Sequence, residues 1–133
     1  MIVLDSSALL AILLREPSAD ALLETVHRAT RRLLSAGTLV EAAMVVIARL
    51  GEAGERELDA LLARFEVEIV PVDGAQARLS RDGFRRFGKG MDRAGLNLGD
   101  LFAYSLARAV AAPLLFVGDD FGRTDVTPAL SPV

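Results

Sequence analysis

The sequence predicts a three-layer α/β domain, with a central parallel sheet of about four strands flanked by helices. One observation is that short apolar runs alternate with helical stretches, because strands separated by helices pair in parallel through right-handed crossovers. Another is length: 133 residues form a single domain, 1–133, that can bury roughly two-thirds of its unfolded surface. Composition agrees, since 52% hydrophobic residues and no cysteine indicate a packed core without disulfides.

Four strands are expected, at residues 1–4, 31–35, 67–70 and 114–117. The first ends in a carboxylate and two hydroxyls, so Asp5 or Ser6 is expected to cap a helix over 6–14. Ser18 is expected to cap the next helix, 19–29. The second strand is assigned on topology more than on propensity, because two arginines stand beside two leucines.

Four further helices are expected, at residues 38–50, 52–65, 73–87 and 99–111. The first of them is apolar almost all round, so we expect it to be buried, and Gly51 ends it. The helix that follows has a single apolar face and is expected at the surface. Residues 88–95 contain three glycines and form a loop, and residues 118–133 form an irregular tail.

Acidic side chains follow strand ends or begin helices at four places. They are Asp5, Glu41, Asp100 and Asp119. The carboxyl ends of parallel strands share one edge of a sheet, where ligands bind, so these acids are expected to converge. Taken singly, each acid is better explained as a helix cap. Thr38 and Glu41 have the spacing of a capping box, and Asn97 and Asp100 come close to one.

Convergence of these acids would require a counter-charge. Two unit charges at ~4 Å repel by about 4 kcal/mol at an effective dielectric near 20, so three or four carboxylates cannot all stay ionised together. Oxygen ligands without cysteine suit Mg²⁺ or Mn²⁺, and the lone histidine, His27, stands among helix-surface residues. Such an ion lowers the pKa of a water for attack on a phosphodiester. The pattern therefore predicts a divalent metal site that can activate a water as a nucleophile.

Four pieces of the chain carry a resemblance to a known family. They are Leu4-Asp5-Ser6-Ser7-Ala8, Glu41 in its helix, Leu96-Asn97-Leu98-Gly99-Asp100, and Leu114-Leu115-Phe116-Val117-Gly118-Asp119-Asp120-Phe121. Together they resemble the PIN domain (PilT N-terminus domain), and within it the VapC toxins of bacterial VapBC toxin–antitoxin pairs. The pieces span nearly the whole chain in the family's order. The resemblance implies a PIN-like fold and a Mg²⁺- or Mn²⁺-dependent endoribonuclease that leaves a 5′-phosphate and acts as a toxin.

The resemblance also implies roles for individual residues. The metal ligands and catalytic acids it implies are Asp5, Asp100, Glu41 and Asp119. Glu41 is either a further ligand or the group that orients the attacking water. The supporting residues it implies are Ser7, Thr38, Asn97 and Asp120. The family's last acid often lies where this chain has Gly118, so either Asp119 or Asp120 can take that position.

Basic charge is concentrated in one segment, although the formal net charge of the chain is −3. Residues 78–93 contain six basic and two acidic side chains, including the only lysine, and lead into a glycine-rich loop. A cationic loop beside a phosphate-cutting site can contact the RNA backbone. The residues expected to do so are Lys89, Arg93, Arg85 and Arg86. The simpler interpretation, that these side chains are only solvated, stays open.

The resemblance implies three partners, namely an RNA substrate, a VapB-like antitoxin and a second copy of the chain. No apolar run reaches the roughly 20 residues that a bilayer demands, and the start lacks a secretory signal, so a cytoplasmic protein without membrane contact is expected. Two alternatives are a receiver-like phosphoacceptor and a non-catalytic interaction module. A receiver domain needs an acidic pair after the first strand, but serines follow Asp5 here. A module whose acids are only caps would not be stabilised by a metal ion.

Overall fold

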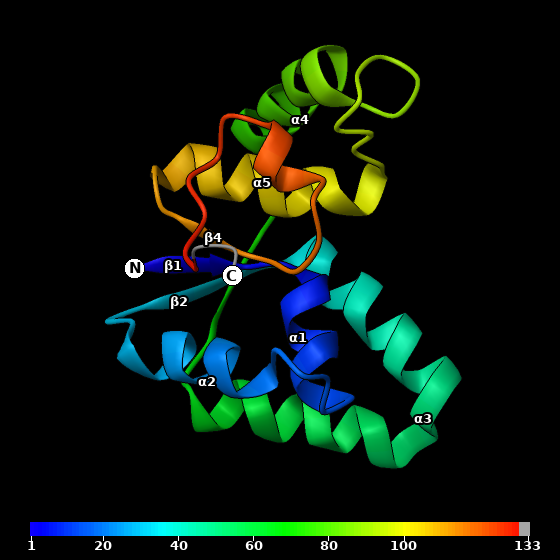
Figure 1. The fold of residues 1–133 in the computed structure, drawn as a ribbon, viewed down its shortest axis with the longest axis vertical. Helices are drawn as coiled ribbons and strands as arrows, with labels where there is room; N and C mark the ends of the chain where they lie inside the picture. The colour runs from blue at the N-terminus through cyan, green and yellow to red at the C-terminus, as the bar shows by residue number, and fades with distance from the viewer. Residues whose placement is uncertain (131–133) are drawn as a thin grey trace.

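Four parallel strands form the middle layer of the protein, seen here in a computed structural model that describes residues 1–130 (Figure 1). The strands are β1 (Ile2–Leu4), β2 (Arg32–Ser35), β3 (Glu68–Val70) and β4 (Leu114–Leu115), and their order in the sheet is β3-β2-β1-β4. Every pairing is parallel, with Val3 opposite Leu33 on one side and Leu114 on the other. The predicted α/β class and number of strands are confirmed, and β4 is shorter than expected.

Alternate residues of the strands pack on opposite faces of the sheet. One face carries Ile2, Leu4, Leu34 and Leu115, and the other carries Val3, Leu33 and Leu114. The first face is covered by α1 (Ser6–Leu13), α2 (Ala19–Arg28) and part of α3 (Ala36–Arg64). The second is covered by α5 (Leu98–Val110), and α4 (Gly74–Phe87) packs outside α5 (Figure 1). Helices on both faces leave the edge formed by the strand ends for a functional site.

The helix α3 contains a break that the sequence predicted. Gly51 has φ 67° and ψ −159°, a left-handed conformation that glycine adopts without steric cost, so two helices meet there. The first of them begins earlier than expected, because Ser35 rather than Thr38 is the N-cap and accepts a hydrogen bond from Gly37 N. The predicted capping box of Thr38 and Glu41 is therefore wrong. The predicted cap at Ser18 also makes no side-chain capping bond.

The first half of α3 is not buried all round, which contradicts the prediction. Val40, Met44 and Ile47 are 60%, 67% and 44% exposed, whereas Ala42 and Val46 on the opposite face are buried. Spacings of four and three residues place the exposed side chains in one row, which we call the α3 apolar stripe. Apolarity predicted what this helix can bury but not which side a neighbour covers. Within residues 1–130, no helix is long and apolar enough to cross a membrane.

The C-terminal segment returns to the sheet and is anchored on α5. Thr127 O accepts a hydrogen bond from Leu114 N, and the hydroxyl of the fully buried Tyr104 donates to Asp125 Oδ1 at 2.8 Å. Burial by itself would raise the pKa of Asp125, but the bond from Tyr104 and the charges of Arg108 and Arg86 hold it below its usual value. Tyr104 therefore has a structural role.

Candidate active site

Asp5 lies at the carboxyl end of β1, a central strand that has β2 on one side and β4 on the other. It is the N-cap of α1, and its Oδ2 accepts hydrogen bonds from Ser7 N at 3.1 Å and Ser7 Oγ at 2.6 Å. The side chain is only 2% exposed, and Oδ1 has no hydrogen-bond partner. Burial raises the pKa of Asp5 to about 6; the bonds from Ser7 oppose this rise, and the charges of Asp100 and Glu41 add to it.

Glu41 reaches the same edge from the first turns of α3. Its Oε1 accepts a hydrogen bond from Ser6 Oγ at 2.7 Å, which ties it to the start of α1. Its Oε2 lies against Gly99, so closely that a methyl group at position 99 would collide with the carboxylate. Because Gly99 precedes Asp100, this approach brings Glu41 to the beginning of α5.

Asp100 lies in the first turn of α5 and forms a full capping box with Asn97. Asn97 Oδ1 accepts a hydrogen bond from Asp100 N, and Asp100 Oδ2 accepts one from Asn97 N, both at 3.0 Å. Burial raises the pKa of Asp100, the bond from Asn97 opposes the rise, and the charges of Asp120 and Glu41 add to it. The capping interpretation is thus confirmed for Asp100, and it is compatible with a place in the acidic site.

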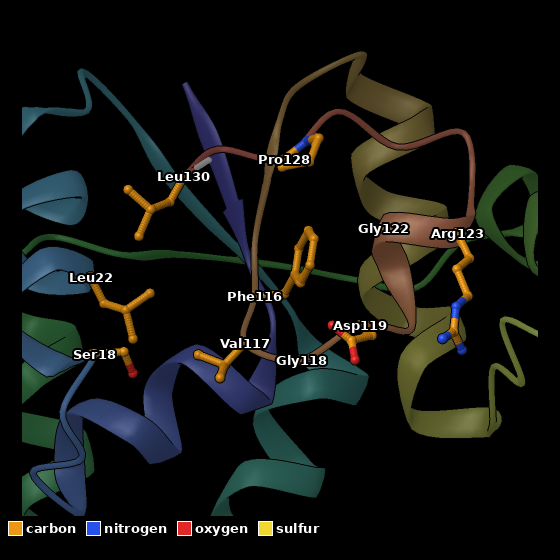
Figure 2. A pocket seen from close by; sticks show the side chains of 10 residues that line it. All are labelled: Ser18, Leu22, Phe116, Val117, Gly118, Asp119, Gly122, Arg123, Pro128 and Leu130. Carbon is orange, nitrogen blue, oxygen red and sulfur yellow. The ribbon is translucent and has the colours of Figure 1, made fainter. Parts of the chain in front are cut away.

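The two acids after β4 point to different places. The charge of Asp120 acts on Asp100, whereas Asp119 lines a cavity and stands at the end of it that lies away from α2 (Figure 2). Gly118 precedes them with φ 102°, a conformation that favours glycine and turns the chain sharply. The structure therefore brings Asp120 close enough to Asp100 for the two charges to interact.

Two buried oxygens in this region lack partners. They are Asp5 Oδ1 and the hydroxyl of Thr38, whose side chain is fully buried. A buried polar atom without a hydrogen bond costs about 1–3 kcal/mol, and such atoms are rare in folded proteins. Ser7, in contrast, is fully used: its Oγ donates to Asp5 and accepts from Val117 N at 3.0 Å, joining the ends of β1 and β4.

The donor set fits a hard divalent cation. Asp5, Glu41 and Asp100 each give one oxygen to a hydrogen bond with a neighbour, and the second oxygen of Asp5 is both buried and without a partner. In residues 1–130, no three His, Cys, Asp or Glu side chains already stand together as a complete ligand set. This arrangement is compatible with Mg²⁺, which keeps several waters and takes only one or two carboxylates directly.

The predicted RNA-contacting residues fall into two groups. Lys89 and Arg93 are exposed in the loop between α4 and α5, and Arg123 Nη1 donates to Arg93 O at 3.3 Å. Arg86 is already held at 3.5 Å from Asp82 and at 3.1 Å from Asp125, and Arg85 stands 3.7 Å from Asp82. The two arginines on α4 therefore already lie beside acidic side chains.

Residue patterns alone did not reveal two positions that shape the site. Ser6 has the pattern of an N-cap, but in the structure its hydroxyl holds Glu41. Gly99 lies directly before an acidic helix start, and a glycine in that place is a weak signal for close approach. No pattern distinguished Asp120 from Asp119, because they are adjacent.

Comparison with known proteins connects this geometry to one family. The PIN domain matches the chain over residues 2–126. Ribonuclease VapC30 of Mycobacterium tuberculosis is 45% identical over 130 residues, which cover 98% of this chain and 99% of the relative. Ribonuclease VapC of Mycolicibacterium smegmatis is 48% identical over 124 residues, covering 93% of this chain and 96% of the relative.

Solved structures show the same fold. The VapC20 toxin of Mycobacterium tuberculosis, described as cleaving the sarcin–ricin loop, has a TM-score of 0.79 at 13% identity and covers 96% of this chain and 97% of its own. VapBC2 from Rickettsia felis, bound to a DNA fragment from its promoter, has a TM-score of 0.74 at 22% identity, with 96% of each chain covered. At these identities the likeness concerns the fold alone.

Proposed function

The chain belongs to the PIN domain family, and from this membership we propose that it is a VapC-type endoribonuclease, the toxin of a toxin–antitoxin pair. The observation that carries the proposal is the buried Oδ1 of Asp5, which has no hydrogen-bond partner and belongs to a carboxylate whose pKa is raised by burial and further by the charges of Asp100, from the start of α5, and Glu41, from α3. The proposed RNA substrate places the activity in the cytoplasm.

The proposed role of each acidic residue follows from the contacts that hold its side chain. Asp5 is fixed as the N-cap of α1 and Asp100 by the capping box with Asn97 at the start of α5, and both would hold Mg²⁺ or Mn²⁺. When bound, the ion neutralises the carboxylates and lowers the pKa of a water for attack on the phosphodiester. Glu41, held by Ser6, would orient the attacking water and accept its proton while the phosphorus–O3′ bond of the RNA breaks. Asp120 takes the fourth acidic position.

The loop between α4 and α5 contacts the RNA backbone. Lys89 and Arg93 are exposed there, and the carbonyl of Arg93 is bonded to Arg123 beside the segment that follows β4. Cationic side chains bind phosphates without reading sequence, so these residues contribute affinity that falls with salt. Arg85 and Arg86 contribute less, because Asp82 and Asp125 already lie beside their charges.

The α3 apolar stripe (Val40, Met44 and Ile47) is the surface best suited to a protein partner. Exposed apolar rows on monomers commonly mark interfaces. We assign this stripe to contact with a VapB-like antitoxin or with a second copy of the chain, in agreement with the toxin–antitoxin complexes among proteins of the same fold.

Cleavage of total RNA tests the proposal. The purified chain should cut RNA with Mg²⁺ or Mn²⁺ and stop with chelator, and Asp100→Asn should be inactive although it keeps a capping side chain. Asp59→Asn, the same change of charge at an exposed position of α3, is the matched control and should cut normally. Metal-dependent cleavage that persists in Asp100→Asn would contradict the assignment of the site.

A further inference from the structure

A cavity of about 650 Å³ opens beside the acidic site, and the proposed reaction does not use it. Its walls come from α2, from the segment after β4 and from the C-terminal segment. In Figure 2, Asp119 and Arg123 stand at one end, Leu22 and Leu130 at the other, and the ring of Phe116 between them. Pockets for small ligands commonly have volumes of about 300–1,000 Å³, with apolar walls and a few polar groups.

The cavity is joined to the catalytic edge by a short chain of hydrogen bonds. Val117 lines the cavity, and its N–H donates to Ser7 Oγ at 3.0 Å. Ser7 Oγ in turn donates to Asp5 Oδ2 at 2.6 Å. Only two hydrogen-bond lengths therefore separate the cavity wall from the carboxylate of Asp5. A nucleotide whose phosphate lies at the carboxylates would have its own base within reach of the cavity.

One polar group of the cavity, Asp119, selects for hydrogen-bond donors, whereas Arg123 at the same end is itself a donor. The carboxylate of Asp119 can only accept hydrogen bonds. Among the RNA bases, guanine alone presents two adjacent donors, N1–H and the N2 amino group, on its Watson–Crick edge. The ring of Phe116 offers a stacking surface, as aromatic side chains do for unpaired bases. A cationic side chain from a protein partner fits less well, because Arg123 stands at the same end.

We propose that this cavity binds an unpaired guanine of the RNA substrate, next to the phosphate that is cut, with Asp119 reading its donors and Phe116 stacking on its face. The inference rests on the proposed ribonuclease activity. It gives Asp119 a role in specificity, and leaves the fourth acidic position to Asp120.

Inosine substitution tests the recognition of guanine by Asp119 directly, because the base of inosine differs from guanine only in lacking the N2 amino group. Short single-stranded RNAs that carry guanine or inosine at each position flanking the cut are compared by kcat/KM. At one position inosine should lower kcat/KM about 10- to 100-fold, the usual effect of losing a hydrogen bond to a charged group. Asp119→Asn should remove the difference, and Asp59→Asn should keep it. Equal rates for guanine and inosine at every position overturn the proposal.

Binding of 5′-GMP in the presence of chelator separates this inference from the enzymatic one. The backbone NMR signals of Val117 and Gly118 should shift with GMP but not with CMP, and the shifts should be lost in Asp119→Asn. Shifts with GMP without cleavage of any RNA support the guanine site and overturn the nuclease. Cleavage without base preference and without shifts on addition of GMP supports the nuclease and overturns the guanine site. Shifts only with a peptide from the C-terminus of a VapB-like antitoxin would make the cavity a peptide-docking surface and overturn the proposal.

Discussion

Replacing Asp5 with asparagine should stabilise the metal-free protein while abolishing cleavage. The asparagine side chain would keep an oxygen that accepts from Ser7 and would suit the N-cap, but it carries no charge. The pKa of Asp5 is raised by burial from 3.8 to about 6 in the folded chain. The stability that the protonated carboxyl contributes is therefore present in full below about pH 4 and is lost as the pH rises through about 6. The free energy of unfolding lost in this way is about 3 kcal/mol.

Urea unfolding followed by far-ultraviolet circular dichroism in chelator measures this loss. The difference in unfolding free energy between Asp5→Asn and the wild type should be near zero at about pH 4 and grow to about 3 kcal/mol at about pH 7.5. Mg²⁺ should shrink the difference at neutral pH, because it binds the ionised site of the wild type alone. Asp59→Asn controls for the change in net charge. A difference that does not vary with pH would refute the burial of an ionisable Asp5.

Three other changes test separate parts of the structure. Gly99→Ala should reduce cleavage about 100-fold by displacing Glu41. Gly74→Ala is the control and should cut normally, because a methyl group has room at that position. Normal cleavage by a folded Gly99→Ala protein would contradict the close approach of Glu41 to Gly99. Tyr104→Phe should lower the unfolding free energy, measured with urea, by about 1–3 kcal/mol without changing cleavage per folded molecule. Lys89→Ala should weaken binding of single-stranded RNA and flatten the slope of log K against log salt by about 0.7; an unchanged slope excludes a phosphate contact there.

The fold was predictable because its signals are local. The runs at β1 and β4 are apolar, with Asp5 directly after the first and Gly118 after the second, and Gly51 interrupts a helical pattern where the backbone becomes non-helical. The exposure of Met44 was not predictable in this way. Hydrophobicity states what a side chain gains by burial, whereas burial itself depends on which neighbour is present, and nothing in residues 1–130 covers the α3 apolar stripe.

The sequence was enough to predict which segments come together at the candidate site. It was not enough to predict which of their atoms do so. Parallel strands bring their ends to one edge, which is enough to place Asp5 and Asp100 in the same region. The choice between Asp119 and Asp120 depends on the turn at Gly118, and a sequence does not give the direction of a left-handed turn. The helix start at Ser35 was missed because hydroxyls at 35 and 38 both suit a cap.

Capping and the proposed metal binding, which the sequence presents as alternatives, depend on the same side chains in this structure. Asp5 and Asp100 accept backbone hydrogen bonds at the starts of α1 and α5, so their carboxylates are held in place before any ligand arrives. Glu41 has no such anchor: it depends on Ser6 and on the absence of a side chain at Gly99. Two fixed acids with raised pKa values and a third held only by side-chain contacts form a site that is electrostatically costly while empty. A cation relieves that cost, which is why binding and stability should change together.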